Sequence, residues 1–168
     1  MNIFVLSKNP QLAAHLHCDK HVVKMILETA QLLYSAHSVI PEGGYKKTHV
    51  NHPCAIWTRE SVANYKWLAE LGWWLCKEYQ FRYGEHKTHK TEKHIVWLTE
   101  NVPDIPDVGL TPFRQAMPVI YKCEDPVEAY QAYYVGDKVP RGFIKYTRRE
   151  QPEFIDARLD DGSTSSVD

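Results

Sequence analysis

The sequence predicts a mainly α, compact single-domain fold with long ordered proline-rich loops. Apolar residues recur at helical spacing along most of the chain, four prolines interrupt this pattern between 103 and 118, and no internal repeat is visible. A chain of 168 residues with 43% hydrophobic content is long enough for one ordinary core and too short to expect two. We therefore expect one helical domain over 1–158, followed by a disordered acidic tail at 159–168.

Two helices are predicted in the N-terminal part of the chain. The apolar run MNIFVL at 1–6 fits an edge strand or a buried tail, and Asn9 then caps a short helix over 10–16. Asp19 can cap a second helix, in which apolar residues recur at i, i+3 and i+4 until Pro41 stops it. This second helix is expected to form the centre of the core.

The remaining elements follow from the same periodicity. One long helix is expected from 53 to 83, with Gly84 as its C-terminal stop, and a shorter helix over about 91–100. Prolines then exclude regular structure for roughly twenty residues, so this stretch is expected to pack as an ordered loop. Another helix is predicted over 125–138, opened by an Asp-Pro pair.

Composition and charge limit the function classes. Twenty basic and twenty-one acidic residues leave a formal net charge of -1, so any nucleic-acid site must be a local patch. The four cysteines form no C-x-x-C pair, which argues against a zinc ribbon and a disulfide scaffold. No basic leader opens the chain, and no apolar segment reaches the roughly 18 residues that a membrane span needs. We expect a soluble, intracellular (cytoplasmic) monomer with no membrane partner.

A row of polar residues follows the second helix at helical spacing. His21, Lys24, Glu28 and Gln31 fall within a sector of roughly 80°, opposite the apolar stripe. Such a row is either the solvated side of an amphipathic helix or a catalytic face that places an amine beside a carboxylate. His17 stands near the start of this helix, where the positive end of the helix dipole favours a phosphate.

Two further clusters have a composition suited to nucleic acid. His52 in THVNHP precedes a predicted helix, where it either caps the helix or contacts a phosphate or a base. In FIKYTRR, basic side chains alternate with aromatic ones, which suits phosphate neutralisation and base stacking and equally a solvated surface segment. The residues of interest there are Lys145, Tyr146, Arg148 and Arg149.

The nine histidines raise the alternative of a metal site. His17 and His21 are four residues apart, and His49 with His52 would complete a set of four nitrogens. Against this, Asp19 is expected to break the helix between the first two, and no carboxylate or thiolate stands at a recognised metal-site spacing. We expect no metal and, because the chain has no Walker loop or dinucleotide glycine pattern, no cofactor.

The order of these motifs resembles one family of DNA repair enzymes. DKHVVKMILE in the second helix, HPCAIWTRESVANYKWLAELGWWLCKEYQFRYG after it and the basic aromatic stretch near the C-terminus are similar to the pyrimidine-dimer DNA glycosylases of the phage endonuclease V family. The resemblance covers 1–84, with a looser echo at 143–149. It implies a compact helical fold, a catalytic Glu28 that follows His21, and the N-terminal α-amine, here that of Met1, as nucleophile. We therefore expect Met1, His21 and Glu28 to be the catalytic residues.

The resemblance also implies DNA as the partner. Together with the clusters above, it predicts a DNA-binding surface that comprises His17, Lys20, Lys24, His52, Arg59, Asn64, Lys145, Tyr146, Arg148 and Arg149. The arginines that the family's helix uses on DNA are missing around the glutamate, where Ile26, Leu27 and Gln31 stand. We therefore expect a damaged or modified base that need not be a pyrimidine dimer.

The implied chemistry is consistent with the residues present. A glycosylase that also cuts the backbone needs an amine to attack the sugar C1′ and a carboxylate to move protons. The ordinary pKa of a free α-amine is about 8, whereas that of a lysine side chain is about 10.4, so a larger fraction of the α-amine is neutral at neutral pH. Asn2 is a poor second residue for removal of the initiator methionine, so Met1 is expected to carry the amine. The expected function is a DNA glycosylase with AP-lyase activity. The alternatives are a non-catalytic nucleic-acid-binding protein and a histidine-based metal-dependent hydrolase.

Overall fold

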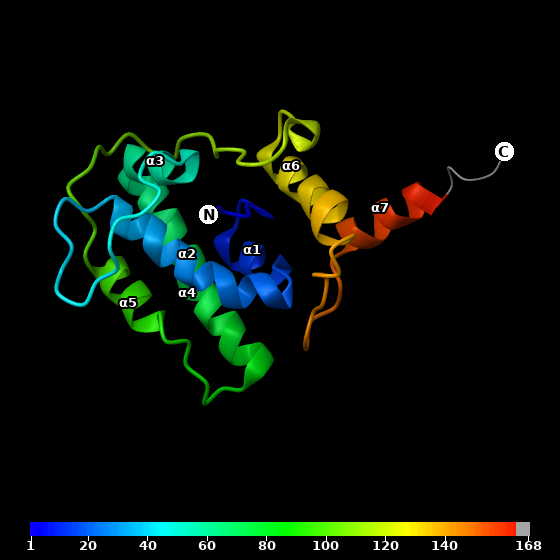
Figure 1. Cartoon of the computed structure of the whole chain (residues 1–168), viewed down its shortest axis with the longest axis horizontal. Helices are drawn as coiled ribbons and strands as arrows, with labels where there is room; N and C mark the ends of the chain where they lie inside the picture. The colour runs from blue at the N-terminus through cyan, green and yellow to red at the C-terminus, as the bar shows by residue number, and fades with distance from the viewer. Residues whose placement is uncertain (164–168) are drawn as a thin grey trace.

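Seven α-helices make up the fold in the computed structural model, which describes residues 1–163 (Figure 1). A 3-10 turn and a π-helical segment accompany them, and no strand occurs within the described range. The elements are α1 (Pro10–Leu16), α2 (Asp19–Ser35), α3 (Pro53–Glu60), α4 (Val62–Tyr83), α5 (Glu92–Glu100), the 3-10 turn η1 (Val119–Tyr121), α6 (Pro126–Tyr133), the π-helix η2 (Tyr134–Lys138) and α7 (Glu153–Ser163). The prediction of a mainly α fold is confirmed. None of the described helices has the length and apolarity needed to cross a membrane.

The core forms where α2 and α4 pack against each other, with α1 and α5 added on α4 (Figure 1). Ile26 and Leu33 of α2 and Leu68 and Leu75 of α4 are all 0% exposed. Burying one such side chain contributes roughly 1.5–3 kcal/mol, so this apolar seam is a main source of stability. The predicted central role of the helix after Asp19 agrees with this packing.

The N-terminal segment is a buried tail and not a strand. Ile3, Phe4, Val5 and Leu6 are each 5% exposed or less, and the segment lies against α2. The Phe4 ring stacks on His21 with 4.4 Å between ring centroids. This segment therefore covers the side of α2 that its sequence marks as polar.

The helix predicted from 53 to 83 is interrupted at Ser61. Ser61 is extended, with φ -153° and ψ 146°, and its hydroxyl oxygen accepts a hydrogen bond from the Ala63 amide at 3.3 Å. The next amide, Val62 N–H, donates to Pro106 O at 2.8 Å, so the proline-rich loop supplies an acceptor that a continuous helix would not use. Side-chain capping and a distant carbonyl together replace two hydrogen bonds of the helix.

The proline-rich loop is ordered by polar contacts with the helical body. Thr111 N–H donates to Asn64 Oδ1 at 2.9 Å, and the Trp57 indole N–H donates to Thr111 O at 3.2 Å. Asn64 Nδ2 also donates to Trp57 O at 2.8 Å. Asn64, expected on the DNA surface, is 0% exposed and holds this loop, because an amide can satisfy loop and helix at once.

The C-terminal part returns to the body and then leaves it in a last helix. After α6 and η2, residues 139–152 run back against the helical body, and α7 follows (Figure 1). The expected disordered tail began at 159, whereas 159–163 belong to α7. The rest of that expectation, 164–168, lies outside the described residues.

Candidate functional site

An amine and a carboxylate meet where the N-terminal tail crosses α2. The α-amine nitrogen of Met1 lies 3.6 Å from Glu28 Oε2, and the two side chains are 5% and 11% exposed. The Asn2 amide donates to the same oxygen at 3.1 Å. The sequence forms this pair because the apolar tail buries itself against α2 and leaves its charged end beside the one carboxylate of that helix face.

Asn2 fixes the position of the amine. Its Nδ2 donates to Ala116 O at 2.9 Å, and its Oδ1 accepts from the Ile3 amide at 2.8 Å and from the Tyr130 hydroxyl at 3.0 Å. These partners come from three separate stretches of chain, so the residue next to the amine is held from several sides. Sequence reasoning gave Asn2 no structural role.

Two lysines of α2 supply further amines on this side of the helix, and their surroundings differ. Lys24 Nζ lies 3.5 Å from Glu28 Oε1, but its side chain is 59% exposed. Lys20 Nζ lies 3.6 Å from the centroid of the Phe143 ring, in a cation–π contact away from Glu28. Of the three amines, that of Met1 is the one that is both held in place and shielded.

His52 stands beside this pair as the cap of α3. Its Nδ1 accepts a hydrogen bond from the Cys54 amide at 3.1 Å, which leaves the proton of the neutral ring on Nε2. Burial lowers the pKa of His52, and the positive charge of the Met1 amine lowers it further. Burial raises the pKa of the neighbouring Cys54 thiol to about 11, so the thiol stays protonated.

His21 and His17 lie in the interior, contrary to the polar surface expected from their spacing. His21 is 5% exposed, and its Nδ1 lies 2.6 Å from the Tyr134 hydroxyl. His17 is 0% exposed and donates from Nδ1 to Ala13 O at 2.6 Å. Burial lowers the pKa of His21 to about 2 and that of His17 to about 4, so both rings are neutral at neutral pH. The N-terminal tail and η2 cover both rings. His21 is therefore not proposed as a catalytic residue, and His17 is not proposed as a DNA contact.

The histidines do not gather into a metal site in the described part of the chain. Within residues 1–163, no group of three or more His, Cys, Asp or Glu side chains is arranged to hold a metal ion. The rings of His17 and His21 are 6.5 Å apart between centroids, and each has a protein partner. The metal-hydrolase alternative therefore receives no structural support.

Comparison with known proteins assigns the family. The family model for pyrimidine dimer DNA glycosylase matches residues 1–91, which is more than half of the 168-residue chain. The chain belongs to this family. No curated protein and no solved structure matches it. Family membership makes it a DNA glycosylase of DNA repair, with DNA as its partner, and the matched range contains Met1, Glu28, His52 and Arg59.

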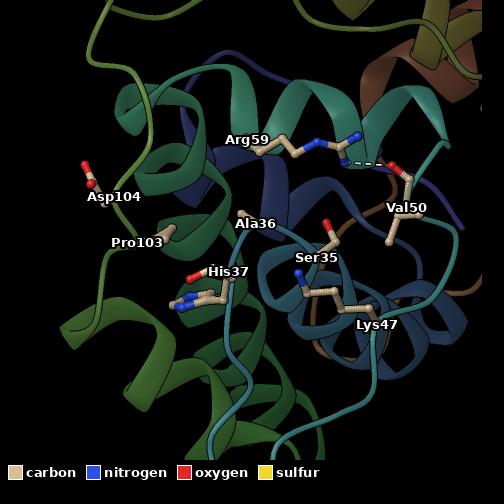
Figure 2. Close-up of a pocket in the computed structure, with 9 residues that line it drawn as sticks. Ser35, Ala36, His37, Lys47, Val50, Arg59, Pro103 and Asp104 are labelled. Atoms are coloured by element: carbon tan, nitrogen blue, oxygen red, sulfur yellow. Dashed lines mark hydrogen bonds between the residues drawn. The ribbon is translucent and has the colours of Figure 1, made fainter.

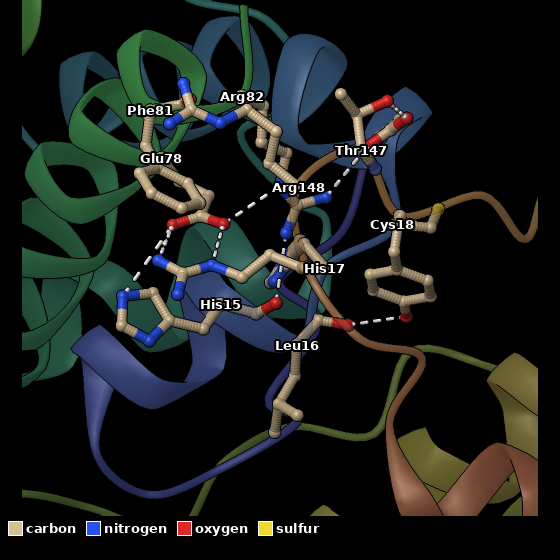
Figure 3. Close-up of polar contacts among 12 residues, drawn as sticks. His15, Leu16, His17, Cys18, Glu78, Phe81, Arg82, Thr147 and Arg148 are labelled. Carbon is tan, nitrogen blue, oxygen red and sulfur yellow. Dashed lines mark hydrogen bonds and ion pairs between the residues drawn. The ribbon is translucent and has the colours of Figure 1, made fainter.

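The basic aromatic segment at 143–149 lies outside the matched range, and several of its residues make polar contacts with the helical body (Figure 3). Arg149 donates to both carboxylate oxygens of Glu78, at 2.7 and 2.9 Å, and the Tyr146 hydroxyl donates to Leu16 O at 2.7 Å. Lys145 and Arg148 are exposed, although Arg148 uses one N–H on Phe81 O at 2.8 Å. Two of the four residues expected to bind DNA are thus occupied in holding the segment on the helical body.

A buried charge network anchors this segment, and sequence reasoning missed it. The side chain of Arg82 is 0% exposed and donates to Glu78 at 2.8 Å, to Asp19 at 3.0 Å and to His15 O at 3.0 Å (Figure 3). Thr147 completes it with an amide and a hydroxyl donated to Asp19. Burial alone would raise the pKa of the Glu78 carboxyl, but its two arginine partners lower it. The i, i+4 spacing of Glu78 and Arg82 was the available signal.

Arg59 lines a cavity of about 490 Å³ at the C-terminal end of α2 (Figure 2). Its Nη1 donates to Val50 O at 2.6 Å, which holds the loop that leads to His52. Lys47 lines the same cavity, and Ser35 lies seven residues after Glu28 along α2, a rise of roughly 10 Å. The cavity is therefore a neighbour of the amine–carboxylate pair and does not contain it.

Proposed function

We propose that this protein is a DNA glycosylase with AP-lyase activity, in which the α-amine of Met1 is the nucleophile and Glu28 accepts its proton. The observation that carries the proposal is the 3.6 Å separation of the amine nitrogen and Glu28 Oε2, in a place where both side chains are nearly buried. An amine attacks only in its neutral form, and a carboxylate within reach can take the proton that the amine loses.

The proposed reaction runs through one covalent intermediate. The amine nitrogen forms a bond to the sugar C1′, the glycosidic bond breaks, and its electron pair leaves with the base. The proton of the attacking amine passes to Glu28, the sugar ring opens, and an imine joins Met1 to C1′. Loss of a proton from C2′ then expels the 3′ phosphate, which is the lyase step. Water finally hydrolyses the imine and frees the amine.

The structure favours Met1 over the lysines for this role. Preorganised geometry is worth several orders of magnitude in rate, and the Met1 amine is fixed through Asn2. Lys24 shares the carboxylate, but with a side chain that is 59% exposed it loses more conformational freedom on reaching a fixed attack position. We assign Lys24 to charge balance beside Glu28 and to contact with the DNA backbone.

DNA contact is proposed for the exposed and half-buried basic groups around this site. A positively charged patch is needed because the formal net charge of the chain is -1. The proposed contacts are Lys20, Lys24, His52, Arg59, Lys145 and Arg148. For the target, we propose a damaged or modified base, since Ile26, Leu27 and Gln31 stand where the family places arginines beside its glutamate.

Borohydride trapping on DNA that contains an abasic site tests this proposal. Borohydride reduces an imine to a stable amine cross-link, and mass spectrometry of the digested complex then locates the modified residue. We expect the cross-link on the Met1 nitrogen, with Glu28→Gln as the variant that fails to form it. A cross-link on Lys24 or Lys20 would contradict the assignment of the nucleophile. Absence of any cross-link would contradict the lyase activity.

A further inference from the structure

Two apolar side chains project from the loop beside the amine site. Val119 and Ile120 are 81% and 84% exposed, the highest values among the large hydrophobic residues that the structure describes. They are adjacent in η1, a single tight turn between the proline-rich loop and α6. Exposing two adjacent apolar side chains to water is unfavourable, so their place on a folded turn suggests that they contact another molecule.

The loop that carries them is closed by a side-chain clamp. Gln115 Nε2 donates to Cys123 O at 2.6 Å, and the Cys123 amide donates back to Gln115 Oε1 at 3.2 Å. Within the turn, the Tyr121 ring packs on Tyr133 with 5.3 Å between centroids. Gly136 makes room for that ring, because a Cβ there would lie 2.3 Å from Tyr121 Cε1. These contacts hold the turn that carries Val119 and Ile120 in one conformation.

The same loop is joined to the reactive end of the chain. Ala116 O accepts from Asn2 Nδ2 at 2.9 Å, and the Ala116 amide donates to the Tyr130 hydroxyl at 3.2 Å. In Figure 1 the chain passes near the N-terminus before it turns into α6. Val119 follows Ala116 by three positions, a reach of at most about 10 Å. The turn that carries Val119 and Ile120 is therefore joined, through Ala116, to Asn2, the residue next to the Met1 amine.

We infer that Val119 and Ile120 form a wedge that enters the base stack of the DNA held at the amine site. This inference rests on the proposed function. A fixed amine cannot approach C1′ of a stacked nucleotide unless the duplex is opened, and inserted apolar side chains are a known means of unstacking and kinking DNA. A pair of side chains is far too small for a stable protein interface, which buries more than ~1,000 Å², but fits between two base pairs.

The test compares duplex with single-stranded DNA. In Val119→Thr/Ile120→Thr, both side chains stay branched at Cβ, while a hydroxyl group replaces a methyl group of Val119 and the ethyl group of Ile120. We expect the rate of borohydride trapping on an abasic duplex to fall roughly ten-fold or more, because unstacking is no longer supported. Trapping on an abasic single strand, which has no stack to open, should be unchanged. Val39→Thr/Val108→Thr is the matched control, since these valines are 78% and 68% exposed on other segments.

A second readout follows the stack directly. 2-Aminopurine next to the abasic site becomes brighter when it is unstacked, and we expect this rise with the wild type and the control but not with the wedge variant. Equal trapping and equal brightness for variant and wild type would overturn the wedge. So would an equal loss on duplex and single strand, which would indicate damage to the amine site. If the wild type forms no cross-link at all, the proposed function fails, and the 2-aminopurine signal alone decides the wedge.

Discussion

A single glycine added ahead of Met1 tests the position of the nucleophile without touching any side chain. Consecutive Cα atoms are 3.8 Å apart, so the new α-amine would start roughly one residue farther from Glu28. From the present 3.6 Å between amine nitrogen and Oε2, the separation would grow to about 7 Å, and the old amine would become an unreactive amide. A misplacement of about 1 Å can already cost ~100-fold in rate, so we expect trapping to fall at least ~100-fold.

The assay is single-turnover borohydride trapping on an abasic oligonucleotide, with DNA affinity and unfolding measured in parallel. Because Asn2 keeps its bonds to Glu28, Ala116 and Tyr130, the extended protein should bind DNA and unfold as the wild type does. The control carries the same glycine after Asp168. Trapping by the extended protein at the wild-type rate would refute the reasoning and shift the nucleophile to a lysine.

Three further predictions follow from the site and the core. Glu28→Gln, which keeps an acceptor for the Asn2 amide but removes the charge, should lower single-turnover cleavage by ~10²–10⁴-fold with DNA affinity nearly unchanged; wild-type cleavage would make Glu28 a structural residue. Lys145→Gln/Arg148→Gln should reduce the slope of log affinity against log salt by nearly two, as titrations at several salt concentrations would show, and an unchanged slope would place the phosphates elsewhere. Burial lowers the pKa of His21 from its ordinary value of 6.5 to about 2. As the pH falls below 6.5, the unfolded chain therefore takes up a proton that the folded protein does not, and the free energy of unfolding decreases by up to about 1.4 kcal/mol per pH unit. His21→Phe should make this fall shallower between pH 6 and 4 in urea unfolding, and an identical slope would contradict the neutral, buried ring.

The helices were predictable from local signals, and the break at Ser61 shows where such signals end. Nothing in the apolar spacing of 53–83 marks Ser61 as a boundary, because a serine is tolerated inside a helix. The interruption depends on Pro106 O, which a loop more than forty residues away brings to Val62. Periodicity cannot predict a helix boundary that depends on a hydrogen bond to a carbonyl far away in the sequence.

The candidate site shows the same division between local and distant information. The placement of Glu28 after His21 identified the helix that carries the carboxylate, but it left open whether this side of the helix is solvated or enclosed. Only the burial of the N-terminal tail and of Tyr134 encloses them. The pairing of Arg149 with Glu78 is likewise a contact across seventy-one residues, and it turns an expected DNA contact into an anchor.

The hydrogen bonds that hold Asn2 determine when the amine–carboxylate site can assemble during folding. Asn2 and Tyr130 are 128 residues apart in sequence, so the hydrogen bond between them can form only after most of the chain has been synthesised. Met1 is synthesised long before Tyr130, and its amine is held in place only once the loop before α6 and α6 itself have formed. A nascent chain that ends before Tyr130 carries the proposed nucleophile and the carboxylate, but it lacks the hydrogen bonds that hold Asn2 in place. The proposed attack on the sugar C1′ would therefore have to wait until folding is nearly complete.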